Sequence, residues 1–290
     1  MTLVVAKATK HQVIILSDTR KGDPRQDRQI GGVTDGLLKT TFLSENIAVA
    51  FTGDPDLAQE TVRGIRGNGL NFRDVLDFFA TATAHNENEY IVGFAGPRRL
   101  FEVRNGSIHE RKAAWIGDKS AFERFQSGPQ SAPQNNFRRA TIIGPDVSEQ
   151  NFVLDQIDRL QTVVEDSTLQ TVGDFFTVAV SNGGRFRFIS IATLYFDAES
   201  RILGPTGNPI LSASGENRAF RFTAWFPRKQ TVAATAFVFP EVKKAFVFHS
   251  KEKGFADECA VFDGLSGDSL ADEIEKKTGI RFEVLEIRHA

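Results

Sequence analysis

The first eighteen residues constrain the fold of this chain more than any other stretch. Residues 2–6 and 13–16 contain two short apolar runs rich in Val, Leu and Ile, and the polar residues 9–12 lie between them. Apolar, β-branched runs bounded by a polar turn predict a β-hairpin in which both strands are buried. The second run is followed by Ser17 and Asp18, so the predicted hairpin carries a carboxylate at its end.

A threonine stands at the start of the first of these strands. If Met1 is removed, Thr2 presents a hydroxyl and a free α-amine on a single residue. Such an amine can serve as the base that activates the hydroxyl of its own residue as a nucleophile. The start of the chain therefore predicts a nucleophilic site, on the condition that Thr2 becomes the N-terminal residue.

A second hairpin and two helices are predicted next. The two strand patterns and the two helical patterns lie, in order, at 39–43, 47–52, 57–65 and 72–80. The hairpin begins with Lys39 and is followed by Gly53. Helices that directly follow four strands are expected to cover one face of an antiparallel sheet.

In these residues the sequence resembles the β-type subunits of the proteasome and the related bacterial peptidase rings, which are N-terminal nucleophile (Ntn) hydrolases. The resemblance rests on a Thr that opens the first strand, an Asp-Thr-Arg that closes the second, and a Lys that precedes a hairpin and a Gly. The spacings from Thr2 to Asp18 and from Lys39 to Gly53 match those of the family, whereas the loop 21–36 is longer by a few residues. The resemblance implies an α+β fold with a four-layer αββα sandwich, in which two antiparallel sheets lie between helix layers.

The resemblance also implies a role for each of these residues. Thr2 supplies the nucleophile, the Lys39 ammonium lowers the pKa values of the Thr2 amine and hydroxyl, and Asp18 fixes that ammonium. The N–H of Gly53 acts as an oxyanion donor, a contribution of about 3–4 kcal/mol where such a donor has been removed. Taken singly, Asp18 also fits a turn cap and Lys39 a solvated strand end.

A further group of site residues is implied after the predicted amphipathic helix 148–165. In the family, an Asp and a nearby Ser after the corresponding helix lie close to the nucleophile and help to set the protonation of its amine. The resemblance therefore implies an accessory role for Asp166 together with Ser167 or Thr168. The turn Gly117–Asp118 matches a Gly-Ser turn beside the family's active site, with Asp in place of Ser.

The resemblance covers residues 2–196, so we expect an Ntn-hydrolase domain over 1–196 and a C-terminal α/β extension of unknown role over 197–290. This extension either continues the same domain or forms a separate small lobe. The second sheet is expected to start at Glu89 and to be completed by 185–195. The extension resembles no family. Its strand patterns lie at 219–225, 232–239, 245–249 and 281–287, its helical pattern at 269–277, and its candidate boundary at the Gly- and Pro-rich segment 204–209.

Composition excludes several classes of function. No apolar run reaches the about 20 residues that a membrane span needs, and a net charge of -2 offers no attraction to nucleic acid or to a membrane surface. The single cysteine excludes an intrachain disulfide and, with no secretory pattern at the start, favours a cytoplasmic location. The five histidines lack the spacing of metal ligands, so neither a metal nor a cofactor is expected.

Two kinds of function are consistent with these features. The first is a threonine hydrolase that cleaves amide or peptide bonds and assembles as a homo-oligomer. The second is a catalytically inactive scaffold or binding subunit with the same fold. The apolar faces of the predicted helices 57–65 and 72–80 favour self-association in either case.

Overall fold

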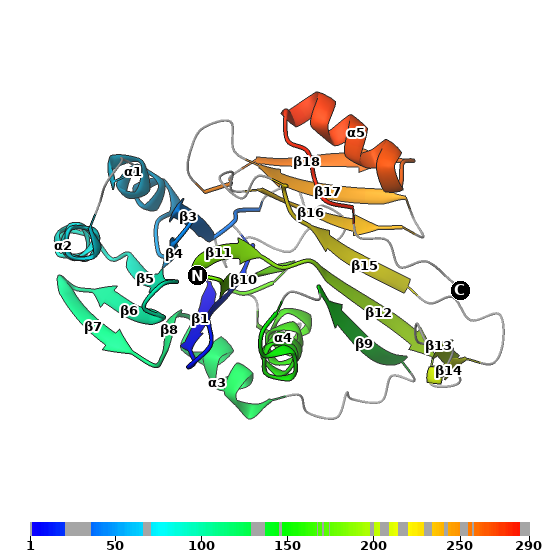
Figure 1. The fold of residues 1–290 in the computed structure, drawn as a ribbon, viewed down its shortest axis with the longest axis horizontal. Helices are drawn as coiled ribbons and strands as arrows, with labels where there is room; N and C mark the ends of the chain where they lie inside the picture. The colour runs from blue at the N-terminus through cyan, green and yellow to red at the C-terminus, as the bar shows by residue number, and fades with distance from the viewer. Residues whose placement is uncertain are drawn as a thin grey trace.

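The chain folds into an α+β structure, which confirms the expected class. The computed structural model describes residues 2–20, 36–65, 71–128, 137–144, 147–166, 168–169, 171–173, 175–197, 200–203, 209–213, 220–228, 234–240, 243–249, 255–256 and 258–284. These residues form three antiparallel sheets, a separate two-stranded ribbon and five helices (Figure 1).

The hairpin at the start of the chain lies in the middle of the first sheet. The strands of this sheet, in spatial order, are β11 (Arg185–Phe188), β10 (Phe176–Asn182), β2 (Val13–Asp18), β1 (Leu3–Ala8) and β8 (Ala113–Gly117). Thr9 closes the turn, because its N–H donates to the Gln12 carbonyl at 2.8 Å and its hydroxyl accepts from the N–H groups of His11 and Gln12. All six residues of β2 are buried, which explains why its first four residues, 13–16, form an unbroken apolar run.

The second sheet is a meander of five strands in sequence order. They are β3 (Thr40–Ser44), β4 (Ile47–Thr52), β5 (Glu89–Phe94), β6 (Arg99–Arg104) and β7 (Ser107–Arg111). The expectation that a new sheet starts at Glu89 is wrong, because Glu89 pairs with Thr52 of β4. The two intervening helices return the chain to the same sheet, and hydrophobic periodicity carries no signal for such a non-local pairing. The predicted hairpin turn at Asn105 and Gly106 is confirmed, with φ angles of 50° and 71°.

Two helices pack on each of these two sheets. α1 (Pro55–Ile65) and α2 (Phe72–Thr83) pack on the second sheet, whereas α3 (Lys119–Ser127) and α4 (Gln150–Glu165) pack on the first. The two sheets face each other through β1 against β4 and β6, and through β2 against β5 (Figure 1). The side chain of Asn71 accepts hydrogen bonds from the first N–H groups of α2, and that of Asp118 does the same for α3.

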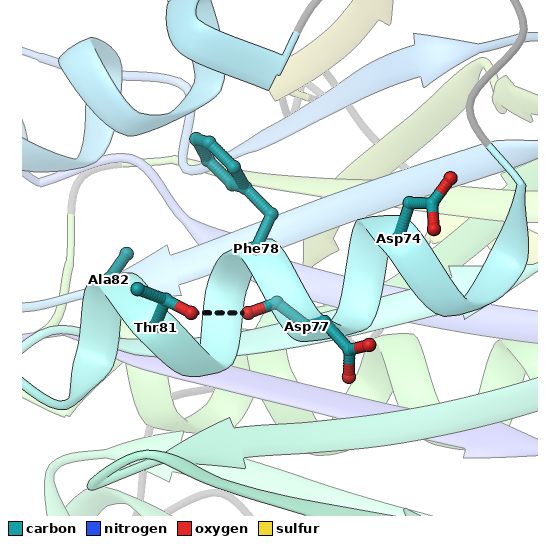
Figure 2. Close-up of a pocket in the computed structure, with 5 residues that line it drawn as sticks. All are labelled: Asp74, Asp77, Phe78, Thr81 and Ala82. Carbon is teal, nitrogen blue, oxygen red and sulfur yellow. Dashed lines mark hydrogen bonds between the residues drawn. The ribbon is translucent and has the colours of Figure 1, made fainter.

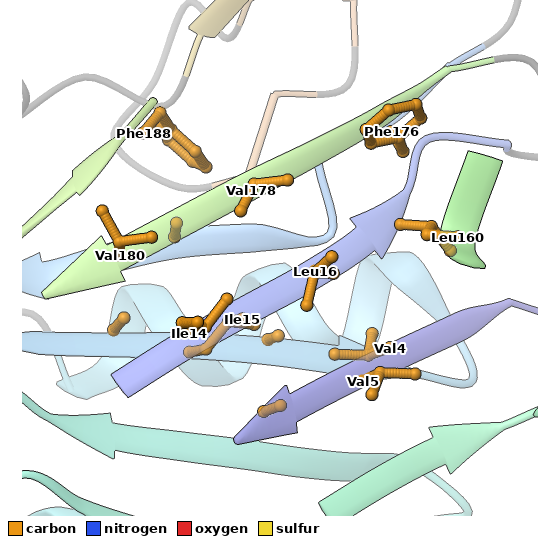
Figure 3. Close-up of a cluster of buried hydrophobic side chains, with 14 of the residues drawn as sticks. Val4, Val5, Ile14, Ile15, Leu16, Leu160, Phe176, Val178, Val180 and Phe188 are labelled. Atoms are coloured by element: carbon orange, nitrogen blue, oxygen red, sulfur yellow. The ribbon is translucent and has the colours of Figure 1, made fainter. Parts of the chain in front are cut away.

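Aliphatic side chains from β1, β2 and β10 form the core beneath α4 (Figure 3). Val5, Ile14, Leu16 and Val178 are buried there, together with Leu160 of α4. Burying one such side chain contributes about 1.5–3 kcal/mol. The ends of β1 and β2 are therefore attached to a well-packed frame.

The third sheet joins residues from both sides of the predicted domain boundary. Its strands, in spatial order, are β18 (Glu258–Asp263), β17 (Lys244–His249), β16 (Ala234–Phe239), β15 (Phe220–Trp225), β12 (Ile191–Asp197) and β9 (Phe137–Ile143). Helix α5 (Gly267–Thr278) packs on it, and β13 (Ser200–Leu203) pairs with β14 (Pro209–Ala213) as the separate ribbon. The first core also includes Phe237 and Phe248 of this sheet. The division at residue 196 stays a prediction, and 204–208 of the candidate boundary lie outside the described residues.

Two predicted strands differ from the structure. The single strand expected over 185–195 is divided, because Arg185–Phe188 belongs to the first sheet as β11 and the chain then enters the third sheet as β12. Of the strand expected over 281–287, Phe282 forms an isolated bridge with Pro227, and 285–287 lie outside the described residues. No helix in the described part of the chain is long and apolar enough to cross a membrane.

Candidate active site

The buried carboxylate of Asp18 contacts two other predicted site residues, Thr2 and Lys39. Its Oδ1 accepts hydrogen bonds from the Thr2 hydroxyl and, at 3.1 Å, from the backbone N–H of Leu3. Its Oδ2 accepts from the Lys39 ammonium at 2.9 Å and from the Arg20 N–H at 3.2 Å. The structure therefore brings Thr2, Asp18 and Lys39 into one contiguous site, and their catalytic roles stay predictions.

The strand arrangement explains why these distant residues meet. β1 and β2 are antiparallel with Val4 opposite Ser17, so the start of β1 lies beside the end of β2. Lys39 comes from the second sheet, where it directly precedes β3 and its carbonyl accepts the Phe51 N–H at 3.1 Å. The ion pair between Asp18 and Lys39 thus connects the two sheets.

The Asp18 carboxylate and the Lys39 ammonium are both buried, so each charge needs the other to offset the cost of its removal from water. The side chain of Asp18 is 0% exposed and that of Lys39 is 5% exposed. Transfer of a single charge out of water costs several kcal/mol, and only a well-placed opposite charge with further hydrogen bonds offsets that cost. Asp18 meets this requirement with one ammonium, one hydroxyl and two backbone N–H groups.

Three buried hydroxyls next to the ion pair were not found by sequence analysis. The Ser17 hydroxyl oxygen lies 3.0 Å from that of Thr40 and 3.0 Å from that of Thr177. Ser17 neighbours Asp18 and Thr40 neighbours Lys39 in the chain, so this contact fixes the spacing between the two strands that supply the ion pair. The sequence signal that could have identified them is a hydroxyl residue inside a buried apolar strand, because a buried hydroxyl needs a hydrogen-bond partner.

Gly53 lies at the end of β4 in a conformation that requires glycine. Its φ is 103°, and a Cβ atom there would lie 2.2 Å from Oδ1 of Asn88. The Asn88 side chain in turn accepts the Asp54 N–H at 2.6 Å and donates to the Asp54 carbonyl at 3.0 Å. The amide of Asn88 therefore fixes the turn after Gly53, while the oxyanion role of the Gly53 N–H stays a prediction.

The turn Gly117–Asp118 lies directly against Thr2. The Asp118 N–H donates to the Thr2 carbonyl at 2.7 Å, and a Cβ atom on Gly117 would lie 2.0 Å from that carbonyl oxygen. Oδ2 of Asp118 accepts from the Thr171 hydroxyl at 2.6 Å. The Asp118–Thr171 pair is thus attached to the main chain of Thr2, a connection that sequence analysis missed because Thr171 belongs to no recognisable pattern.

A second carboxylate, Glu89, lies at the same end of the sheets. Its Oε2 is 3.3 Å from the Gly117 N–H and 3.4 Å from the Thr52 hydroxyl, both of which donate to it. Arg104 lies 3.9 Å from its other oxygen. The ends of β4, β5 and β8 are therefore joined beside Thr2 by a carboxylate that sequence analysis did not identify, since an acidic residue at a strand start usually lies in solvent.

Asp166 has a different set of partners from Asp18. It is the residue that ends α4, and its Oδ1 accepts from the hydroxyl and the N–H of Thr168 at 2.6 and 3.0 Å. Its Oδ2 accepts from Arg124 at 3.2 Å. The Thr168 hydroxyl holds the pKa of Asp166 below its ordinary value, with Arg124 contributing in the same direction. The contacts of Asp166 thus lead to α3, and its accessory role stays a prediction, while Ser167 lies outside the described residues.

The shallow hollow on the outer surface of α2 is separate from this site. It is lined by Asp74, Asp77, Phe78, Thr81 and Ala82, and the Thr81 hydroxyl donates to the Asp77 carbonyl within the helix (Figure 2). None of its lining residues belongs to the site around Thr2. Among the described residues, no group of three or more His, Cys, Asp or Glu side chains is arranged to hold a metal ion.

Comparison with known proteins adds no family assignment. No protein-family model matches the chain, and no curated protein matches it. The geometry around Thr2 is therefore the basis for any functional conclusion.

Proposed function

We propose that this protein is an N-terminal threonine hydrolase that cleaves amide or peptide bonds, and that its two facing sheets with their outer helices are a four-layer αββα sandwich of the Ntn type. One observation carries the proposal: the Thr2 hydroxyl is hydrogen-bonded to the buried ion pair of Asp18 and Lys39. A buried hydroxyl such as that of Thr2 needs a hydrogen-bond acceptor, and Asp18 supplies one. The ammonium beside this acceptor is what supports a nucleophilic role, because a fixed positive charge favours loss of the hydroxyl proton.

The reaction begins once Met1 is removed and Thr2 carries a free amine. The amine takes the hydroxyl proton while Oγ1 attacks the carbonyl carbon of the substrate, forming a tetrahedral intermediate. The protonated amine then gives its proton to the leaving nitrogen as the amide C–N bond breaks, which leaves an ester on Thr2. A water molecule, activated by the same amine, hydrolyses this ester and restores the hydroxyl.

The remaining residues have supporting roles in this proposal. Lys39 provides a fixed positive charge beside the nucleophile, and Asp18 holds both the ammonium and the hydroxyl in place. The Gly53 N–H is the proposed donor to the oxyanion, since glycine there lets the substrate approach the backbone closely. Asp118 fixes the main chain of Thr2 through its N–H.

Covalent labelling tests the nucleophile. We expect the processed wild-type protein to react at Thr2 with an electrophile directed at N-terminal threonine, and Thr2→Ala to lose both labelling and hydrolysis while its thermal stability changes little. Thr2→Ser should keep partial activity, because the hydroxyl and amine survive. Thr81→Ala is the matched control, since the Thr81 hydroxyl donates to the Asp77 carbonyl within α2 and lies outside the site.

Intact-mass analysis of protein made in its own host tests the required processing. A chain that starts at Thr2 and labels there supports the hydrolase. A processed chain that resists labelling, with Thr2 still in contact with Asp18, contradicts the hydrolase and favours the inactive scaffold or binding subunit.

Self-association is proposed on separate grounds. Leu57 on α1 and Phe78 on α2 are 41% and 36% exposed, and Figure 2 shows Phe78 beside the hollow of α2. Large apolar side chains in solvent on neighbouring helices support a contact surface. We expect a homo-oligomer through this helical face, without a fixed number of subunits. Mass photometry that detects only the 32.1 kDa monomer at micromolar concentration would rule it out.

A further inference from the structure

We propose that the third sheet is a positioning element for the ion pair of Asp18 and Lys39, with Phe248 and Ala256 as the residues that act on the segment carrying Lys39. The physical claim concerns the geometry of the pair. Its effect on catalysis rests on the proposed hydrolase function.

A backbone hydrogen bond makes the most direct connection. The Leu38 N–H donates to the Ala256 carbonyl at 2.8 Å, one residue before Lys39. On the other side, the Leu37 N–H donates to the Thr19 carbonyl at 2.8 Å, one residue after Asp18. The segment before β3 is therefore held between the end of the Asp18 strand and Ala256, which lies two positions before β18.

Ring packing adds a steric contact to the same segment. A Cβ atom on Gly36 would lie 1.8 Å from a ring carbon of Phe248, which is fully buried on β17. The ring of Phe248 thus occupies the space that a side chain on Gly36 would need. No larger residue fits at position 36 without a displacement of the ring or of the chain leading to Lys39.

Two further aromatic contacts support the backbone at Lys39 and next to Asp18. Phe255 is fully buried with its ring centre 4.4 Å from that of Phe51, whose N–H donates to the Lys39 carbonyl. Phe248 also packs against Phe175 at 5.9 Å, and Phe175 accepts the Thr19 N–H next to Asp18. The third sheet therefore supports the backbone on each side of the pair.

The topology explains the need for this support. β3 is the edge strand of the second sheet, so β4 is the neighbour that pairs along its length. The Lys39 ammonium pairs with a carboxylate of the other sheet, so the main chain of Lys39 must be fixed to within a fraction of an ångström. A shift of about 1 Å can lower a reaction rate roughly 100-fold. Contacts with residues 248 and 255–256 supply this constraint.

Two substitutions test the proposal, one that creates a steric clash between positions 36 and 248 and one that removes it. Gly36→Ala places a methyl group against Phe248 and should displace the segment that carries Lys39. Phe248→Val removes the ring carbons in question and leaves a side chain that suits a β-strand. We expect Gly36→Ala to lower kcat of the processed enzyme at least roughly tenfold with little change in KM. The double variant Gly36→Ala/Phe248→Val should recover most of the loss, because the added methyl group takes up the space of the removed ring carbons and keeps the contact.

Phe262→Val is the matched control. Phe262 is buried on β18 in the cluster with α5, and its ring lies under the ammonium of Lys277. This variant weakens the same sheet without touching residues 36–38. We expect a lower thermal stability with an unchanged kcat and pH profile.

A readout that needs no hydrolysis keeps this proposal separate from the proposed function. NMR titration of the protein with ¹³C-labelled lysine reports the Lys39 Cε signal and its pH midpoint directly. Gly36→Ala should shift both, and the double variant should restore them. A Gly36→Ala protein with the wild-type Lys39 signal, or a double variant as perturbed as the single one, overturns the proposal, whereas a wild-type protein without activity overturns the hydrolase function alone.

Discussion

Asp18 and Asp166 have different partner residues of the same chemical kinds, and they differ in their surroundings. Each carboxylate accepts hydrogen bonds from a threonine hydroxyl, from the backbone and from a cationic side chain, with two backbone N–H groups for Asp18 and one for Asp166. Asp18 and its partner Lys39 are 0% and 5% exposed, whereas the side chains of Asp166 and Arg124 are 24% and 21% exposed. Water screens the charges of Asp166 and Arg124 and can replace their contacts. Asp18 and Lys39 are almost fully shielded from water, so these two groups depend on each other. The buried pair of Asp18 and Lys39 therefore constrains the local geometry more strongly than the partly exposed pair of Asp166 and Arg124.

The largest expected difference is in activity. Asp18→Asn removes the charge that fixes the Lys39 ammonium, and we expect it to lower kcat/KM by roughly 100-fold or more. Asp166→Asn should lower it far less, because the partners of Asp166 are Thr168 and Arg124. The measurement is kcat/KM for amide hydrolysis by the processed protein. Equal losses in the two variants would support the accessory role that sequence analysis assigns to Asp166.

The second difference concerns the cation of each pair. Lys39→Arg should lose most activity, because a planar guanidinium does not fit where a buried ammonium lies 2.9 Å from Asp18. Arg124→Lys should be nearly neutral, since its pair is accessible to water. Steady-state kinetics of both variants checks this, and a Lys39→Arg enzyme at the wild-type rate would show that the site tolerates any positive charge.

The third difference is in stability. Asp18→Ala leaves the Lys39 ammonium buried without its carboxylate, so we expect a loss of about 3–5 kcal/mol in the free energy of unfolding. Asp166→Ala should lose about 0–1 kcal/mol, as exposed pairs do. Denaturant unfolding at neutral pH measures both values. Similar losses would mean that the two pairs are equally desolvated, contrary to their exposure.

The smallest expected effect is the acid dependence of Asp166. The pKa of this carboxyl is lowered in the folded chain from an ordinary value of 3.8, mainly by the Thr168 hydroxyl. A lowered folded-state pKa gives stability that is present above the ordinary value and is lost as pH falls through the folded pKa. Unfolding of wild type and Asp166→Asn between about pH 2 and 6 should therefore converge toward the acid end. Parallel curves over this range would contradict the shift.

The elements with strong local patterns were predicted well. The hairpin at 2–18, the Asn105–Gly106 turn and the helices after Asp54 and Asn71 are confirmed, because apolar periodicity, caps and turn residues act over a few positions. The assignment of strands to sheets was less successful. β5 joins β4 across two helices, and the strand expected at 185–195 is divided between two sheets. Such pairings depend on which distant surfaces bury most apolar area, and no local pattern records that.

The sequence by itself determined the order of the site residues along the chain, the apolar strands that carry Thr2 and Asp18, and the hairpin that follows Lys39. The tertiary structure alone decided that a carboxylate and an ammonium from two different sheets are buried together, and that the Thr2 hydroxyl is bonded to them. It also decided that Asp118 and Glu89 lie at this end of the sheets and that Phe248 and Ala256 hold the segment before Lys39. The physical reason is that burial and charge pairing are properties of packed surfaces, which form only when segments far apart in the chain are brought together.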